Sequence, residues 1–190
     1  MNTQHETSST PNPISGSTDT LAMLTFTVGE QVYGLPVANV VRIIEMITIT
    51  RLPGAPDIIK GIINVQGKTV PVIDVRHRFG LPARPYGAHT PIILTDPGRN
   101  ERTIGLIVDT VQDVLSVASK NLEMTEMIVP PGLEQQITGQ AAYLAGVAKV
   151  AQQLIVVLNA RALLSLTEQT KLLQAINSDG RLKSMNAPNK

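Results

Sequence analysis

Short runs of valine and isoleucine, broken by glycine and proline every roughly eight to twelve residues, are the feature that most limits what this chain can form. β-Branched residues favour strands, and Gly and Pro mark the turns between them. The runs that predict strands are Leu24–Val28, Val32–Val37, Val70–Asp74, Ile92–Thr95, Thr103–Val108 and Leu154–Leu158. Gly29-Glu30 and Asp96-Pro97-Gly98 lie between such runs and predict hairpin turns. The pattern indicates a mostly β fold of small barrels or a sandwich.

Helical periodicity is confined to the C-terminal part of the chain. Ser165 followed by Glu168 matches a capping box, which begins a helix. We expect one apolar stripe on this helix, formed by Leu166, Leu172, Leu173 and Ile176.

The two ends of the chain are polar. Residues 1–20 consist largely of Ser, Thr, Pro, Asn and Gly, which bury too little to offset the entropy of ordering, so we expect a disordered tail. Residues 177–190 are expected to form a flexible tail. Neither a secretory signal nor an apolar run of roughly 18–20 residues is present, so we expect a cytoplasmic protein without direct membrane insertion.

Two blocks of sequence recur in the same order in the two halves of the chain. Tyr33–Val40 aligns with Ile104–Val111, and Ile58–Phe79 aligns with Tyr143–Leu164. The residues that coincide include Gly34 with Gly105, Gly61 with Gly146, and the capping side chains Asp74 with Asn159. This spacing favours a duplication over chance, with an insertion in the second half around Leu122–Gln140. Two small barrels side by side would leave a groove in which ligands or partners bind.

The sequence offers no catalytic or metal-binding motif. It has no cysteine, and His5, His77 and His89 do not share metal-ligand spacing, so we expect no metal and no cofactor. Asp74 and Asp109 each follow a strand-like run, where an aspartate caps the next turn more often than it performs acid–base chemistry. With no nucleophile elbow or phosphate-binding loop, we expect that the protein is not an enzyme.

Charge and aromatic content argue against nucleic acid as a partner. Lys and Arg total 16 against 15 Asp and Glu, and aromatic residues make up 3% of the chain. A surface that follows phosphates needs a basic excess, and base stacking needs aromatic side chains. Binding of single-stranded nucleic acid by an OB-like barrel therefore stays only a distant alternative, and protein partners are favoured.

Five segments, in order, resemble the CheW family of chemotaxis adaptors. They are Phe26–Val37, Arg51–Arg76, Ile104–Leu115, Leu144–Lys149 and Leu154–Asn159. The likeness extends from about Leu24 to Leu164.

This resemblance implies a fold of two small five-stranded barrels, OB-like or SH3-like, with exchanged strands and a C-terminal helix. On that basis the CheW-like domain covers residues 21–176. The first barrel is expected at about 21–85, the second at about 86–160 and the helix at about 160–176.

The resemblance also implies a non-catalytic function in chemotaxis signal transduction. Proteins similar to CheW couple the cytoplasmic tips of methyl-accepting chemoreceptors to the regulatory domain of a CheA-type histidine kinase. They are recruited to membrane-bound receptor arrays, where self-association in rings is possible. The alternative within the same fold is a scaffold of a non-flagellar chemosensory pathway, which controls surface motility or second-messenger output.

By the same analogy, eight residues lie at or behind partner surfaces: Val40, Arg42, Gly61, Asn64, Gln66, Gly105, Val111 and Val114. For the glycines, a backbone role fits as well as a contact role. The family commonly has Glu at the position of Arg42 and Arg at the position of Gln66, and those two side chains would form an ion pair. Here one partner is reversed and the other is neutral, so we expect an altered choice of partner.

Overall fold

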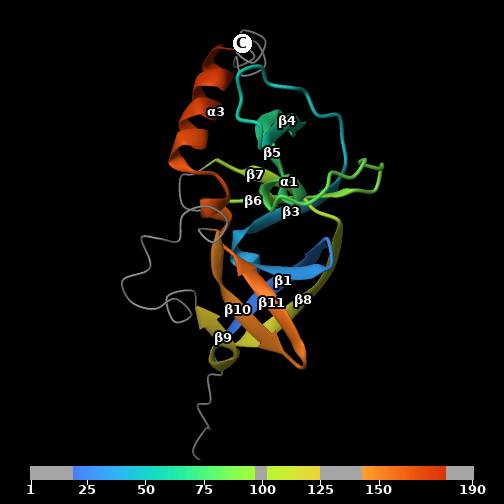
Figure 1. Ribbon diagram of the computed structural model, residues 1–190, viewed down its shortest axis with the longest axis vertical. Helices are drawn as coiled ribbons and strands as arrows, with labels where there is room; N and C mark the ends of the chain where they lie inside the picture. Colours follow the sequence, from blue (N-terminus) through green and yellow to red (C-terminus); the bar gives the residue numbers. More distant parts are fainter. Residues whose placement is uncertain (1–18, 97–101, 125–142, 179–190) are drawn as a thin grey trace, which may run out of the picture.

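The computed structural model describes residues 19–96, 102–124 and 143–178, which form two sheets and a C-terminal helix (Figure 1). The first sheet has the order β8-β1-β2-β11-β10-β9 and the second β3-β6-β7-β5-β4. The first consists of β1 (Thr20–Val28), β2 (Gln31–Pro36), β8 (Thr110–Ala118), β9 (Leu122–Met124), β10 (Leu144–Val150) and β11 (Gln153–Leu158). The second consists of β3 (Val40–Glu45), β4 (Ile59–Val65), β5 (Lys68–Asp74), β6 (Pro91–Thr95) and β7 (Ile104–Ile107).

The mostly β fold is confirmed, and each of the six runs singled out in the sequence overlaps one of these strands, two of them extending one residue beyond one or both ends of it. The turn Gly29-Glu30 joins β1 to β2, with Gly29 at φ +65°. Of the second predicted turn only Asp96 is described, since residues 97–101 lie outside the described ranges.

Each sheet closes on itself. In the first, the end strands β8 and β9 are consecutive in the chain and are joined by the short helix η2 (Ser119–Asn121). In the second, Thr50, a few residues beyond β3, exchanges two backbone hydrogen bonds of 2.8 Å with Ile62 of β4. With β8 and β9 taken as one bent strand, both sheets are five-stranded barrels, as the family resemblance implies.

The two barrels exchange strands. The first barrel combines the N-terminal hairpin β1–β2 with the late strands β8–β11, whereas β3–β7 form the second barrel. Two segments therefore cross between barrels: η1 (Val37–Asn39), after β2, and the residues Val108 and Asp109, which lie between β7 and β8. The first barrel is therefore built from two separate pieces of chain, whereas the second barrel is one continuous piece from β3 to β7.

The structure bears out the internal repeat. β11 runs parallel to β2 with Val157 opposite Gly34, and β5 runs parallel to β7 with Val72 opposite Gly105. The two pairs are equivalent, because the sequence blocks align Gly34 with Gly105 and Val72 with Val157. Asp74 accepts hydrogen bonds at the start of α1 (Val75–Arg78), and Asn159 does the same at the start of η4 (Ala160–Leu163).

Gly61 and Gly146 occupy equivalent bulges in this repeat. The register of β4 against β5 shifts between Ile59 and Gly61, and that of β10 against β11 shifts between Leu144 and Gly146. A Cβ atom on Gly61 would lie 2.3 Å from the carbonyl oxygen of Thr50. One on Gly146 would lie equally close to that of Glu123. Both glycines let a neighbouring strand approach closely enough to close its barrel.

A column of aromatic side chains links the barrels. Phe26 and Tyr33 of the first barrel have ring centroids 6.0 Å apart, and Tyr33 lies 4.8 Å from Phe79, which follows α1. Phe79 lies 5.0 Å from Tyr143, just before β10, and Arg78 covers the Tyr143 ring at 5.6 Å. The column packs within or against one core cluster that draws on both barrels and α3 (Leu166–Ser178).

The capping box at the start of α3 is present. The Ser165 backbone N–H donates to Oε2 of Glu168 at 2.8 Å, and the Glu168 N–H donates to Oγ of Ser165 at 3.3 Å. Arg78 also donates to Oε1 of Glu168 at 3.0 Å, which ties α3 to α1. Burial alone would raise the pKa of Glu168, but the Ser165 hydrogen bonds and Arg78 lower it below its ordinary value.

The prediction of a single apolar stripe on α3 is wrong. Leu172 and Ala175 are buried, but Leu166 is 82% exposed and Leu173 is 43% exposed. The helix docks with the face that carries Leu172, Ala175 and Ile176, at helical spacings of three and four. Leu166 and Leu173, seven residues apart, share a different face.

The described elements extend slightly into the two ranges that were predicted to be tails. β1 begins at Thr20, and α3 extends to Ser178, two residues beyond the expected end of the helix. The rest of both tails, residues 1–18 and 179–190, lies outside the described residues. So does most of the expected insertion, of which β9 is the described beginning.

Substitution of Gly61 by Ala is expected to lower the free energy of unfolding by about 2–4 kcal/mol, because the new Cβ would overlap the Thr50 carbonyl at a φ of +150°. The measurement is urea unfolding followed by circular dichroism. Gly87→Ala is the control, since its nearest neighbour would be 4.0 Å away, and it should change stability by less than about 0.5 kcal/mol. Equal effects of the two substitutions would contradict the backbone role of Gly61.

Candidate functional site

Four of the residues that the family resemblance singles out lie on β3 and β8. Val40 begins β3 and Val111 lies early in β8, and both are half-buried against the main core cluster. Arg42 is exposed on β3, and Val114 is 59% exposed on β8. Val40 and Val111 therefore pack inward, while the side chains of Arg42 and Val114 are exposed to solvent.

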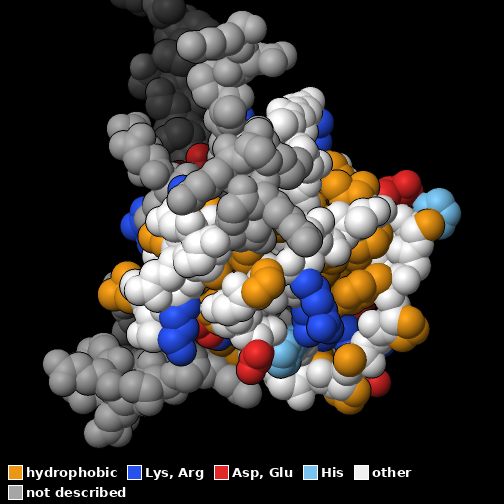
Figure 2. All heavy atoms as spheres, turned by 90° about the horizontal axis from the view of Figure 1, so that it is seen from above, with side chains coloured by type: hydrophobic (Ala, Val, Ile, Leu, Met, Phe, Trp, Pro, Cys, Tyr) orange, Lys and Arg blue, Asp and Glu red, His pale blue; other side chains and the backbone are white. Residues whose placement is uncertain are grey.

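β3 exposes apolar side chains around Arg42. Val41 is 59% exposed, Ile43 is 42% exposed, and Ile47, just beyond the strand, is 41% exposed. We call Val41, Arg42, Ile43 and Ile47 the β3 surface. Seen from the end of the molecule at the top of Figure 1, hydrophobic side chains gather beside Lys and Arg side chains (Figure 2). Clustered exposed apolar side chains of this kind mark sites of protein association.

The sequence contained a signal for the β3 surface that was not used. Val40 to Ile44 are apolar at every position except Arg42. A strand apolar on both faces is either buried on both or exposes one of them. In the structure Val40 and Ile44 pack against core clusters while Val41 and Ile43 are exposed, so the second alternative holds here.

Asn64 and Gln66 shape the hairpin between β4 and β5. Gln66 and Gly67 have φ angles of +53° and +79°, the values of a two-residue hairpin turn. Oδ1 of Asn64 accepts a hydrogen bond of 2.8 Å from the Gly67 N–H. Asn64 thus serves the turn, while the Gln66 side chain is exposed at its tip.

The acidic residue of β3 pairs away from Arg42. Although β3 bulges between Val40 and Arg42, the Glu45 carboxylate bonds Nδ1 of His89 at 2.8 Å. The hydrogen bond to Glu45, and then its charge, raise the pKa of His89 above its ordinary value. Within the described parts of the chain, Arg42 takes part in no ion pair, so β3 presents an exposed cation that lies, in the sequence, between the exposed Val41 and Ile43.

Gly61 and Gly105 are buried. Gly61 closes the second barrel as described above. A Cβ on Gly105 would lie 3.0 Å from Cγ2 of Ile92 and 3.3 Å from Cγ2 of Val72, the neighbouring strands of the same barrel. Both glycines therefore have a backbone role within the second barrel, where a Cβ atom would crowd the neighbouring chain.

A polar cluster lies where the chain crosses from β7 to β8. Oδ2 of Asp109 accepts hydrogen bonds from Nη1 of Arg76 at 2.5 Å and from the Gly29 N–H at 2.7 Å. Gly29 belongs to the first barrel, and Arg76 lies on α1 of the second. Asp109 thus fixes the barrels to each other.

Beside this cluster lies a cavity of about 300 Å³ whose lining includes Asp74 and Tyr86. Asp74 is 2% exposed and accepts hydrogen bonds from the N–H groups of Arg76 and His77 and from the Tyr86 hydroxyl at 2.6 Å. Burial, and then Asp74, raise the pKa of Tyr86 well above its ordinary value.

Both aspartates that could have served acid–base chemistry are engaged in holding the structure. Asp74 caps α1, as the capping interpretation predicts, whereas Asp109 caps no turn and instead pairs with Arg76 and the Gly29 N–H. Over residues 19–96, 102–124 and 143–178 there is no cluster of three His, Cys, Asp or Glu side chains fit to hold a metal ion. Within the same ranges, no helix has the length and hydropathy to cross a membrane.

Two linked barrels with an apolar outer strand, and carboxylates committed to structure, define an interaction module of the double-barrel class. Comparison with known proteins identifies the family. Residues 22–168 match the CheW-like domain. The chain is 31% identical to the chemotaxis protein CheW of Klebsiella aerogenes over 159 residues, which cover 84% of this chain and 90% of that one. It is 26% identical to CheW of Treponema pallidum, with 84% and 91% covered.

A solved structure agrees with these relatives. The crystal structure of the scaffolding protein TtCheW from Thermoanaerobacter tengcongensis superposes with a TM-score of 0.66 and 30% identity. The match covers 78% of this chain and 95% of that one. The chain therefore belongs to the CheW-like family, and it is a scaffold of chemotaxis signal transduction.

The two arginines that face Asp109 allow a matched test of the junction. Arg76→Gln is expected to lower the free energy of unfolding by about 2–4 kcal/mol, because the side chains of the pair are only 13% and 10% exposed and Asp109 would lose its buried partner. Arg84 lies 3.8 Å from the same oxygen but is 65% exposed, so Arg84→Gln should cost less than about 1 kcal/mol. Chemical unfolding of both variants checks this, and similar losses would show that Asp109 does not depend on Arg76.

Proposed function

We propose that this chain couples the cytoplasmic tips of chemoreceptors to the regulatory domain of a CheA-type histidine kinase, without catalytic activity of its own. Membership of the CheW-like family supports the pair of partners. The commitment of Asp74 and Asp109 to hydrogen bonds supports a non-catalytic role. The protein acts in the cytoplasm, at membrane-bound receptor arrays.

The β3 surface is the observation that carries this proposal. It offers Val41, Ile43 and Ile47 to a partner without prior unfolding, since all are already exposed. A receptor tip is a helical hairpin, and the apolar face of a helix is recognised by grooves and surfaces of this kind. Val114 on β8 extends the partner surface onto the first barrel.

Arg42 selects the receptor or kinase that this surface accepts. A partner suited to the glutamate that is common in the family presents positive charge there, which would oppose Arg42. Juxtaposed like charges at an interface cost several kcal/mol. The cognate partner of this chain therefore carries an acidic or neutral group opposite Arg42, and Gln66 removes the second charge of the usual pair.

Pairing of the barrel ends with kinase domains builds the larger assembly. Each barrel has a hairpin with an exposed turn, β4–β5 in the second barrel and β10–β11 in the first. Because the two ends of the molecule differ, head-to-tail pairing can close a ring rather than stop at a dimer. Self-association in rings is part of this proposal.

Calorimetric titration with a CheA-type regulatory domain, and separately with a receptor-tip hairpin, tests the coupling function. Arg42→Glu combined with Gln66→Arg is expected to bind typical family partners in the micromolar range, about −8 kcal/mol. The unaltered chain should bind the same typical partners at least about tenfold more weakly than the double variant does, because its Arg42 opposes the positive charge of those partners.

Lys171→Glu combined with Gln174→Arg is the matched control. Both residues are exposed on α3, and the pair changes the net charge by the same amount as the test pair. The control should bind like the unaltered chain. Equal affinities of the test variant and the unaltered chain would refute the charge argument, whereas no binding by any form to either partner would refute coupling itself.

A further inference from the structure

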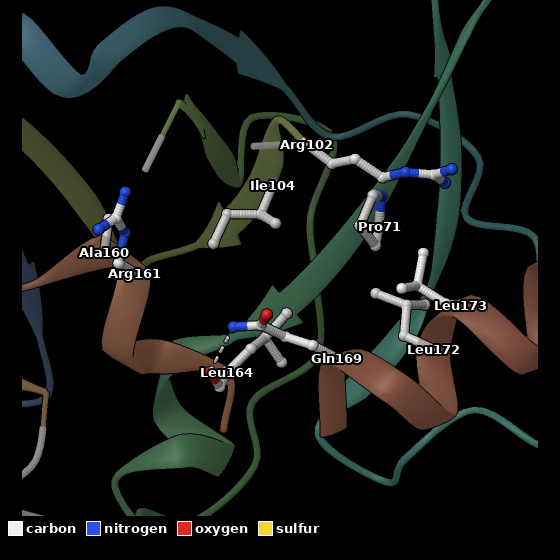
Figure 3. Close-up of a pocket in the computed structure, with 9 residues that line it drawn as sticks. All are labelled: Pro71, Arg102, Ile104, Ala160, Arg161, Leu164, Gln169, Leu172 and Leu173. Atoms are coloured by element: carbon white, nitrogen blue, oxygen red, sulfur yellow. Dashed lines mark hydrogen bonds between the residues drawn. The ribbon is translucent and has the colours of Figure 1, made fainter. Parts of the chain in front are cut away.

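A second apolar surface lies beside α3, where the helix packs near the strands β5 and β7. A cavity of about 250 Å³ lies between α3, η4 and the strands β5 and β7 (Figure 3). Pro71 and Ile104 contribute from the strands, and Leu164 and Leu172 contribute from the C-terminal segment. We call this cavity the α3 groove. None of its residues belongs to the β3 surface.

The helix beside the groove keeps apolar side chains in solvent. Leu173 lines the groove and is 43% exposed, and Leu166, seven residues earlier on the same face, is 82% exposed. Their burial would stabilise the fold, but nothing in the described parts of the chain covers them. An apolar stripe that continues out of a groove along a helix has the form of a docking face.

The size of the groove argues for inserted side chains rather than an enclosed small molecule. Sites that enclose a small molecule have roughly 300–1,000 Å³, and this groove is smaller. One or two apolar side chains of a partner helix, spaced at successive turns, match its volume.

Charge distinguishes between possible partners. Arg102 lines the groove (Figure 3), and no acidic residue is among its described lining residues. Lys171 is exposed on the same helix, and the nearby Glu168 is already bonded to Arg78 and Ser165. A second copy of this chain would bring cations against cations, whereas an acidic segment would complement them.

We propose that the α3 groove binds an acidic amphipathic helix of a partner protein. Leucine-like side chains of that helix enter between α3 and the strands, next to Leu173. Its carboxylates lie over Arg102. This contact is separate from the receptor and kinase contacts proposed above, and it gives the scaffold a further protein partner.

The probe is a labelled synthetic helical peptide with leucines at successive turns and glutamates beside them, titrated with the full chain and followed by fluorescence anisotropy. Saturable binding is expected. Leu173→Gln should weaken it by about tenfold, and Arg102→Gln by about threefold to tenfold. Both residues are exposed at the surface, so the variants should keep the circular dichroism spectrum and melting temperature of the parent.

Matched controls separate this site from nonspecific adhesion. Leu154→Gln alters a leucine that is 59% exposed on β11 of the other barrel and should leave binding unchanged. A peptide with lysine for glutamate should bind more weakly, and one with glutamine for leucine should not bind. Absence of binding, equal affinity for the acidic and basic peptides, or no effect of Leu173→Gln would overturn the proposal. A dimer of the peptide-free chain that Leu173→Gln abolishes would assign the groove to a second copy and would also overturn it.

Discussion

The stacked aromatic column is the interaction on which the arrangement of this molecule depends. The chain has only five Phe and Tyr residues and no Trp, and four of the five form the column. Its rings come from both barrels, and Arg78 extends it through Glu168 to the first turn of α3. Stacked aromatic pairs add about 0.5–1.5 kcal/mol beyond the area they bury. The column therefore connects the two barrels and, through Arg78 and Glu168, also connects them to α3.

The duplicated architecture explains why the same kinds of residue occur at equivalent positions of the two barrels. Each barrel is completed by a parallel pair, β2 with β11 or β7 with β5, and each pair places a glycine opposite a valine. A second glycine in each half, Gly61 or Gly146, admits the strand that closes the barrel. Because the second barrel is inserted in the sequence between β2 and β8, the chain completes the first barrel only after it has passed through the second. The Asp109 cluster stands at the return crossing and contacts both barrels.

Local patterns in the sequence predicted the local structure. The valine and isoleucine runs predicted strands, Ser165 and Glu168 predicted the cap of α3, and the two aligned blocks predicted the repeat. What depended on distant partners was not predicted: which face of α3 would be covered, and that Tyr33 would meet Phe79. Helical spacing places Leu166 and Leu173 on one face, but only the docking of α3 decides that this face stays in solvent. The candidate partner residues came from the family resemblance, and the structure separates them into exposed side chains and supporting glycines.

The two candidate surfaces combine the same kinds of side chain. In both, an exposed cation accompanies exposed aliphatic side chains: Arg42 lies between Val41 and Ile43 in the sequence, and Arg102 lines the same groove as Leu173. The net charge of the chain is only +1, so these local charges matter more to the proposed recognition than the total charge does. Under the proposals above, aliphatic contact supplies affinity to many helices, whereas the cation rejects those that bring a like charge. A change of one such charge would then alter one partnership and leave the barrels and the other surface intact.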